Sequence, residues 1–315
     1  MNRKVIVLLS TYNGEHYIEE QIDSILNQKD VDVSLLVRDD GSIDNTVLVL
    51  KHYVAENDNV ILSDDTGNLG VGNSFMKLLS IAGDYDYYAF ADQDDVWDED
   101  KLISAVKSIG QEEKPILYCC NQRNVDEDRN FLNVRFLDSY RPPSLISAVF
   151  ANYYAGCAMV MNRELRNLLI QENNLPDEEF FKHRIHDAWV TCVALATGTI
   201  YYDKQPHMDF RRSGNNYSDE YAPGSKTSYF KRYYGKLRRL RSGKLKKNGC
   251  SLTAAELIAR FPDYLSPEQK KCLLEIMNYK RSFGSRIRFI LSKTVKTNLS
   301  GNRLAFMAKV LIGIL

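Results

Sequence analysis

Short apolar runs alternate with helix-length segments over the first 110 residues of the chain. The apolar runs cover residues 5–9, 33–37, 60–62 and 85–91. The segments that follow them cover residues 15–28, 44–56, 71–81 and 98–109. This alternation predicts βαβ units and a mostly parallel sheet covered by helices. We therefore expect a Rossmann-like α/β fold in this part of the chain.

Polar residues gather directly after each expected strand. They stand at positions 10–13, at 39–42, at 64, 68 and 70, and at 92–95. In open α/β sheets, ligands bind outside the carboxyl ends of the strands. Four strands are therefore expected to contribute to a single site.

The rest of the chain divides into a mixed region and a basic region. Candidate strands lie at residues 116–120, 158–161 and 199–202, and candidate helices at 163–171 and 186–196. Residues 217–228, which include Pro223 and Gly224, have the composition of a junction. We expect one domain over residues 1–224, with halves at 1–110 and 111–224, and a basic helical extension over residues 225–315.

The net charge of zero hides a division between these regions. Residues 225–315 hold 21 Lys and Arg against 4 Asp and Glu, a net charge of +17, which leaves residues 1–224 at −17. An acidic body suits metal and sugar chemistry, whereas a basic tail suits an anionic partner.

Cysteine spacing and hydropathy indicate the cellular compartment in which the protein is expected. The six cysteines show no CxxC spacing, which argues against a zinc ribbon or a disulfide framework and fits a reducing cytoplasm. The first apolar run is too short for a secretory signal, and no run reaches the roughly 18 to 20 apolar residues of a membrane-spanning helix. We expect a cytoplasmic protein whose membrane contact is peripheral.

Three carboxylates stand within four residues directly after the fourth expected strand. Asp92, Asp94 and Asp95 would repel one another unless a cation neutralised them. Mg²⁺ or Mn²⁺ takes oxygen ligands, so this cluster could connect the protein to a diphosphate. The alternative is a solvated acidic turn that caps the next helix.

Two further segments suggest a nucleotide. Asp39 and Asp40 open the stretch DDGSIDNT, in which Ser42 or Asp44 can cap a helix while a remaining carboxylate accepts a hydrogen bond from a pyrimidine NH group. The stretch GNLGVGNS at residues 67–74 permits a tight turn close to a ligand, but it lacks the third glycine of a dinucleotide-binding motif.

In this order, the motifs resemble the inverting family 2 glycosyltransferases of the GT-A fold. The resemblance covers residues 5–216 and depends on STYN at 10–13, DDGSIDNT at 39–46, NLG at 68–70, DQDD at 92–95, Gly-Cys at 156–157 and HDAW at 186–189. The segments ADQDDVW and HDAW are most similar to bacterial rhamnosyltransferases and related enzymes of cell-surface polysaccharide synthesis, such as capsule or O-antigen. The resemblance implies that residues 1–110 bind a nucleotide sugar and residues 111–224 an acceptor.

The resemblance also implies roles for the matched residues. The residues that would hold the nucleotide are Thr11, Tyr12, Asp39, Asp40, Asn68 and Asp92. Asp92 and Asp94 would bind a divalent metal, Mn²⁺ or Mg²⁺, and Asp95 would share it or steady the loop. Asp187 would be the general base, because an inverting transfer needs one carboxylate to take the proton of the attacking hydroxyl. The metal would stabilise the charge on the departing diphosphate.

Four residues would surround the sugar or the acceptor. Gly156 and Cys157 resemble the small-residue turn that lines the sugar pocket. His186 would either tune the neighbouring base or be a buried, hydrogen-bonded histidine. Trp189 would either stack on an acceptor sugar or pack in the core.

One segment departs from the family pattern. Residues 210–216, FRRSGNN, resemble a YRQHGxN segment whose histidine can complete the metal site, but Ser213 stands at that position here. His207 could substitute from nearby, or Arg211 and Arg212 could place positive charge on the diphosphate.

The basic extension suggests a membrane surface. Residues 231–247 carry nine basic residues and no acids, and further on Ile287, Ile290, Leu291 and Val295 follow helical spacing. Such helices can lie in an anionic membrane interface, which fits an acceptor linked to polyprenyl pyrophosphate at the cytoplasmic face. The alternative is a helical subdomain or an oligomer contact that packs on the acidic body. Nucleic acid is not an expected partner, since no recognised nucleic-acid module is present.

The sequence therefore predicts an inverting transferase that uses a dTDP- or UDP-sugar, with rhamnose as the leading choice, and a saccharide acceptor. One alternative is a catalytically degenerate member of the family that binds sugar or acts as a scaffold. Another is a nucleotidyltransferase, which would be expected to carry a basic, Gly-rich segment after the first strand that STYNGEHY lacks.

Overall fold

The computed structural model describes residues 3–65, 67–135, 140, 142–212, 249–299 and 303–313. Its strands are β1 (Lys4–Thr11), β2 (Asp32–Asp39), β3 (Val60–Leu62), β4 (Tyr87–Ala91), β5 (Val96–Trp97), β6 (Ile116–Val125), β7 (Phe131–Val134), β8 (Met159–Asn162) and β9 (Thr199–Arg211). The helices that accompany them are α1 (Ile18–Leu26), α2 (Thr46–Glu56), α3 (Val71–Ile81), α4 (Lys101–Ile109), α5 (Leu145–Phe150), α6 (Arg163–Ile170), α7 (Glu178–His183) and α8 (His186–Thr197).

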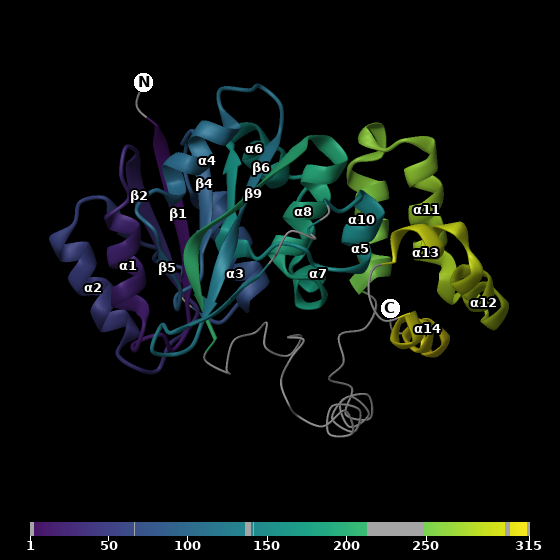
Figure 1. The fold of residues 1–315 in the computed structure, drawn as a ribbon, viewed down its shortest axis with the longest axis horizontal. Coiled ribbons are helices and arrows are strands. Elements are labelled where there is room, and N and C mark those ends of the chain that lie inside the picture. The colour runs from purple at the N-terminus through teal and green to yellow at the C-terminus, as the bar shows by residue number, and fades with distance from the viewer. Residues whose placement is uncertain are drawn as a thin grey trace.

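The strands form one nine-stranded sheet in the order β3-β2-β1-β4-β8-β6-β9-β5, with β7 paired to β6 (Figure 1). β3, β2, β1 and β4 are parallel, as the alternating pattern predicts. β8 lies antiparallel between β4 and β6, while β6 and β9 are parallel to each other. The expectation of a mostly parallel sheet flanked by helices is confirmed.

Alternate residues of the central strand enter two separate cores. In β1, Val5, Val7 and Leu9 face a core that includes residues of α1 and α4, whereas Ile6 and Leu8 face a core that includes residues of α3, α6 and α8. Because side chains alternate across a strand, a strand covered on both faces is apolar throughout. This explains the uninterrupted apolar run at the start of the chain.

Two strands extend beyond their expected ends. β6 continues to Val125 and β9 continues to Arg211, and they pair in parallel over this length with register shifts. The second half of β6 holds buried polar residues, and the side chain of Arg123 donates from Nε to Asp209 of β9 at 2.6 Å. Paired polar side chains replace the apolar pattern there, so hydropathy gave no sign of a strand.

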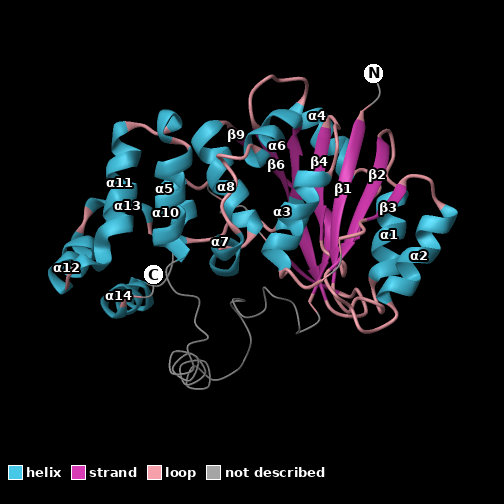
Figure 2. Ribbon diagram, turned by 180° about the vertical axis from the view of Figure 1, so that it is seen from behind, coloured by secondary structure: helices cyan, strands magenta, loops and turns pink. Residues whose placement is uncertain are grey.

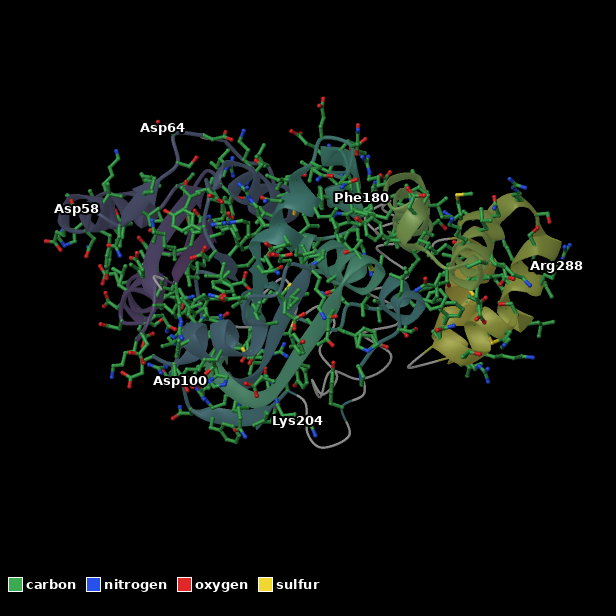
Figure 3. The ribbon with its side chains drawn as sticks, turned by 90° about the horizontal axis from the view of Figure 1, so that it is seen from above. Asp58, Asp64, Asp100, Phe180, Lys204 and Arg288 are labelled. Carbon is green, nitrogen blue, oxygen red and sulfur yellow. The ribbon has the colours of Figure 1, made fainter. Side chains whose placement is uncertain are left out.

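The described part of the C-terminal region is helical. It comprises α10 (Gly249–Arg260), α11 (Pro267–Asn278), α12 (Phe283–Leu291), α13 (Lys293–Asn298) and α14 (Arg303–Ile312). These helices lie at the end of the molecule away from α2 (Figures 1 and 2), and Asp58 and Arg288 mark the two ends in Figure 3. The expected junction at 217–228 and the basic run at 231–247 lie outside the described residues.

These helices pack on the α/β body through their inner faces. Leu257 of α10, Ile276 of α11 and Phe289 of α12 are buried in the core that also holds residues of α5 and α8. The helical pattern expected through residues 287–295 is divided, because Ser292 ends α12 and its hydroxyl accepts the Val295 amide to cap α13. Among the described helices, none has the length and apolarity needed to cross a bilayer.

Candidate active site

The ends of β1, β2 and β4 meet at one edge of the sheet. Thr11 and Asp39, the last residues of β1 and β2, are joined by a 3.0 Å hydrogen bond from the Thr11 hydroxyl to the Asp39 carboxylate. Tyr12 and Gln93 exchange two hydrogen bonds, from the Tyr12 amide at 2.8 Å and from the Gln93 side-chain amide at 3.1 Å. The expected convergence of these polar loops is therefore present.

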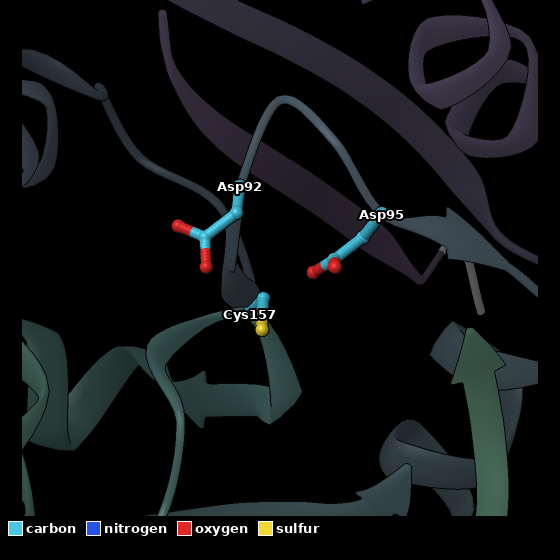
Figure 4. A group of neighbouring side chains, drawn as sticks. All are labelled: Asp92, Asp95 and Cys157. Carbon is cyan, nitrogen blue, oxygen red and sulfur yellow. The ribbon is translucent and has the colours of Figure 1, made fainter. Parts of the chain in front are cut away.

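The loop after β4 carries a buried acidic cluster. Asp92, Asp95 and Cys157 are neighbours (Figure 4), and ligand atoms of these three residues all lie within 4.8 Å of one another. Asp95 is almost completely buried, and its Oδ2 has no hydrogen-bond partner in the structure. Asp94 does not belong to this group of side chains.

The protonation of the cluster reflects burial and mutual repulsion. Burial, followed by the charge of Asp94, raises the pKa of Asp92 from 3.8 to about 7. The same two causes raise the pKa of Asp95 well above its ordinary value, and burial likewise raises the pKa of the Cys157 thiol. Two repelling carboxylates, one of them with an oxygen that has no hydrogen-bond partner, fit a hard divalent cation, whereas a protonated thiol does not.

Arg211 contacts the backbone of the acidic loop after β4. Its guanidinium donates from Nε to the Asp94 carbonyl at 3.0 Å and from its other nitrogens to Glu20 and to the carbonyl of Glu127. The side chain is buried and lies over the ring of Tyr17. It therefore supports the acidic loop in this structure, which differs from the diphosphate contact expected from the sequence.

Two other cationic candidates lie in β9 or directly after it. Arg212 donates its backbone amide to Val125 at 2.8 Å, and its guanidinium lies over the ring of Phe210. His207 contacts carboxylates of Asp100 at 3.0 Å and Asp203 at 3.3 Å, and does not join the Asp92 group. The idea that His207 replaces a metal-binding histidine is not supported, and Ser213 lies outside the described residues.

The residues expected to hold the nucleoside occupy different environments. The side chains of Tyr12 and Asn68 are exposed, Asp39 is partly exposed, and Thr11 is buried. Asp39 accepts hydrogen bonds from the backbone amides of its own turn, at 3.1 Å and 2.8 Å. Asp40 is buried and faces the protein interior. This position differs from the direct nucleoside contact that was expected from the sequence.

Asp187 lies in the first turn of α8, where both oxygens of its carboxylate accept hydrogen bonds. Its Oδ2 accepts a 2.7 Å hydrogen bond from the side-chain amide of Asn152, and its Oδ1 accepts one of 2.6 Å from the Ala188 backbone amide. Burial raises the pKa of Asp187, while the bond from Asn152 acts in the opposite direction. The Gly156-Cys157 turn connects Asp187 to the acidic loop, because the Cys157 thiol lies in the Asp92 group and a Cβ on Gly156 would lie 2.5 Å from the ring of His186, the neighbour of Asp187. No motif indicated Asn152, which lies in a loop 35 positions before Asp187.

His186 is packed among rings and makes no hydrogen bond from its ring nitrogens. Its ring centroid lies 4.1 Å from that of Phe75 and 4.9 Å from that of Phe90. Burial lowers the pKa of His186 to about 3, so the ring is neutral near pH 7. His186 is buried, as one interpretation from the sequence expected, but its ring nitrogens have no hydrogen-bond partner in the structure and it carries no charge that could tune the base. A Cβ on Gly156 would lie 2.5 Å from Nε2 of this ring, so the close approach requires glycine.

Trp189 belongs to the core. It is fully buried, with ring centroids 5.2 Å from Phe180 and 6.0 Å from Phe261 of the C-terminal region. The expectation of a sugar-stacking surface at Trp189 is therefore wrong, and its packing alternative holds. The spacing of the HDAW motif alone could not show whether Trp189 faces the core or the site.

Known proteins share this architecture. The model of the family described as "Glycosyl transferase family 2" matches residues 6–168. The chain is 29% identical over 217 residues to the dTDP-rhamnosyl transferase RfbG of Shigella flexneri, which covers 66% of this chain and 72% of that protein. It is 33% identical over 100 residues to the putative teichuronic acid biosynthesis glycosyltransferase TuaG of Bacillus subtilis, covering 31% of this chain and 38% of that one.

Solved structures show the same fold at lower identity. S. aureus TarS 1-349 in complex with UDP has a TM-score of 0.59 at 15% identity, covering 98% of this chain and 87% of that chain. The mannosyltransferase PcManGT of Pyrobaculum calidifontis, in complex with GDP-Man and Mn²⁺, has a TM-score of 0.52 at 17% identity, covering 98% and 79%. With the family model matching more than half of its length, the chain belongs to glycosyl transferase family 2 and is a nucleotide-sugar glycosyltransferase of the GT-A fold.

Proposed function

We propose that this enzyme transfers a sugar, with inversion, from a dTDP- or UDP-sugar to a hydroxyl of a saccharide acceptor. The observation that carries the proposal is that the Gly156-Cys157 turn contacts both the Asp92 group and His186, the residue directly before Asp187. One carboxylate is thereby available to act on the acceptor beside a second that can hold the donor. Rhamnose is the leading sugar, because the similar protein RfbG is described as a dTDP-rhamnosyl transferase.

Asp187 acts as the general base. The acceptor hydroxyl oxygen bonds to the anomeric carbon while its proton passes to the Asp187 carboxylate. The bond from that carbon to the diphosphate breaks, and its electron pair leaves on the diphosphate oxygen. A base is most effective when its pKa lies near the working pH, and burial moves the pKa of Asp187 upward in that direction.

Asp92 and Asp95 are the residues that hold a divalent cation, Mn²⁺ or Mg²⁺. When bound, the ion supplies a positive charge that stabilises the leaving diphosphate. Arg211 and Gln93 keep the acidic loop in place, through the Asp94 carbonyl and through Tyr12. The chain's own side chains thus orient the loop, bind the cation and accept one proton.

The acceptor is a saccharide attached to polyprenyl pyrophosphate, approached at the cytoplasmic face of the membrane. Two features of the C-terminal region support this. Residues 276–315 contain eight Lys and Arg and no Asp or Glu. The outer face of α12 also exposes apolar side chains, which can enter the interface of an anionic bilayer beside those cations.

The test separates binding from chemistry with an Asp187→Asn variant. Asn keeps the shape of the side chain but cannot accept the proton, so kcat should fall by about 10²- to 10⁴-fold. The dissociation constant of the nucleoside diphosphate, measured by calorimetry with Mn²⁺, should be unchanged. The exposed Asp58→Asn variant, at the far end of the molecule (Figure 3), is the control and should retain full kcat.

Donor identity is tested with a panel of dTDP- and UDP-sugars, each with Mn²⁺, Mg²⁺ or chelator. Metal-dependent stabilisation and turnover with one nucleoside are expected, because a ligand of the native state raises apparent stability. If no compound binds or turns over, the scaffold alternative replaces the proposal. Equal loss of kcat and of donor binding in Asp187→Asn would remove Asp187 from the role of base.

A further inference from the structure

The two consecutive aspartates at the end of β2 face different surroundings. Asp39 binds Thr11 and the amides of its own turn at the polar edge of the sheet. Asp40 turns inward, where its Oδ1 accepts a 2.6 Å hydrogen bond from Nη1 of Arg38. Both members of this ion pair are buried, and Arg38 is fully enclosed.

The guanidinium of Arg38 connects three parts of the chain. Besides Asp40, its Nη1 donates to the hydroxyl of Ser74 in α3 at 3.0 Å, and its Nη2 donates to the carbonyl of Gly67 at 2.7 Å. The Ser74 hydroxyl in turn lies 2.7 Å from that of Ser10 in β1. One side chain therefore links β2, the loop before α3, α3 itself and, through Ser74, the end of β1.

Asp40 completes the connection to the loop. Its two carboxylate oxygens accept the backbone amides of Leu69 at 2.7 Å and of Gly70 at 2.9 Å. Gly70 has a positive φ of 78°, a conformation that glycine adopts without strain. The loop at residues 67–70 is thus held from two sides. Arg38 binds its carbonyl group and Asp40 binds its amide groups.

Stability alone is a weak reason for this arrangement. Burying two charges costs free energy that their attraction repays only with good geometry, and apolar replacements are often as stable. What the ion pair provides is a fixed position for a glycine-containing loop at the edge where Thr11 and Asp39 converge. Preorganising such a loop lowers the entropy lost when a ligand binds.

We propose that Arg38 is a positioning residue of the nucleotide site, acting through Asp40, Ser74 and the Gly67 carbonyl to hold the 67–70 loop against the bound nucleoside diphosphate. This inference rests on the proposed use of a nucleotide sugar. Lysine could not replace Arg38, because an ammonium group lacks the planar set of donors that reaches three acceptors at once.

The test compares Arg38→Lys with Arg163→Lys. Arg163 also binds carboxylates, those of Asp84 and Asp86, but these precede β4 at the opposite edge of the sheet. The dissociation constants of dTDP and UDP with Mn²⁺, the donor KM, kcat and the ligand-free Tm are measured for each. Arg38→Lys should raise the dissociation constant and the donor KM by about tenfold, equivalent to ~1.4 kcal/mol, with kcat changed by less than about twofold. Arg163→Lys should bind like the wild type.

A second pair keeps the test decisive if Arg38→Lys does not fold. Ser74→Ala removes one acceptor of the guanidinium, while Ser80→Ala removes an exposed hydroxyl from the same helix. Ser74→Ala should weaken nucleotide binding and Ser80→Ala should not. Wild-type binding in folded Arg38→Lys and Ser74→Ala, even with a lowered Tm, would overturn the positioning role. Absence of nucleotide binding in the wild type would instead overturn the proposed function on which it rests.

Discussion

The side-chain amide of Asn152 donates a 2.7 Å hydrogen bond to Oδ2 of Asp187, although the two residues are 35 positions apart. Asn152 lies in an exposed loop and Asp187 in the buried first turn of α8. The bond stabilises the ionised carboxylate and fixes its orientation. Asn152 is therefore part of the environment of Asp187, the proposed base.

Replacing Asn152 by Ala should shift the pH dependence of catalysis. Burial already raises the pKa of Asp187, and loss of the opposing hydrogen bond should raise it further. Since the base must be ionised, the acidic limb of the kcat/KM profile should move to higher pH, and activity should fall most at low pH. An unchanged limb in a folded, donor-binding variant would show that the bond does not control the base.

Asp95→Asn should have opposite effects on metal binding and on metal-free stability. The change removes a carboxylate charge from the proposed cation site, so Mn²⁺ affinity, measured by titration followed with electron paramagnetic resonance, should fall. In the metal-free protein at pH 7 the pKa of Asp95 is raised by burial and by Asp94, so ionisation opposes folding and Asn relieves it. The metal-free Tm should rise, by about 1.5 °C for each kcal/mol relieved in a chain of 315 residues.

The control for this variant is Asp100→Asn, whose carboxylate belongs to the separate group with Asp98 and His207. It should leave Mn²⁺ binding by the Asp92 group intact. A lowered metal-free Tm in Asp95→Asn would mean that the carboxylate is stabilised in the fold by a partner other than a cation.

Gly156→Ala should destabilise the protein through His186. The new Cβ would lie 2.5 Å from Nε2, and Phe75 and Phe90 leave the ring little room to withdraw. Overpacking of this kind costs about 1 to 3 kcal/mol, measurable by urea denaturation. Gly284→Ala, where the nearest atom to the Cβ lies at 3.8 Å, should be neutral or stabilising.

The coupling can be checked with a double variant. Adding His186→Ala to Gly156→Ala should recover part of the lost stability, because the clashing ring is gone. Additive losses in the double variant would contradict the contact.

Hydropathy predicted those strands that are covered on both faces. The apolar runs in β1, β2 and β4 reflect two cores. The sequence therefore predicted these strands and their parallel direction. The long pairing of β6 with β9 was missed, because polar contacts such as Arg123 with Asp209 replace apolar side chains there. A local hydropathy pattern indicates only those strands whose side chains are buried in apolar surroundings. Strands such as β6 and β9, which are paired through polar side chains, do not show such a pattern.

The candidate site was predictable only where its residues form local motifs. The acidic loop and Asp187 stand in short, recognisable segments, whereas Arg211 reaches Glu20 across 191 positions of sequence. The surroundings of His186 and Trp189 are set by distant helices, so their burial could not be derived from the HDAW motif. Roles that depend on a remote partner require the fold.

The outer face of α12 gives the last prediction. Phe283, Ile287 and Leu291 are spaced four residues apart along one side of the helix and are 68%, 39% and 62% exposed. Replacing all three by Ser should weaken binding to vesicles that contain phosphatidylglycerol by at least about tenfold, since each apolar side chain gains roughly 1.5 to 3 kcal/mol on full burial. Cosedimentation measures this, and kcat on a soluble acceptor should be unchanged because these side chains are far from Asp187 in the chain's fold.

The matched control replaces equally exposed apolar residues of the acidic body. Leu48, Val54 and Ile61 are 68%, 38% and 45% exposed on α2 and β3. Their triple Ser variant should bind vesicles like the wild type, because the surrounding charge is negative. Wild-type binding should also decrease with salt, since cations beside α12 contribute through a screened attraction. If the α12 variant sediments like the wild type, the C-terminal helices serve to pack on the body, and the exposed stripe has no part in membrane contact.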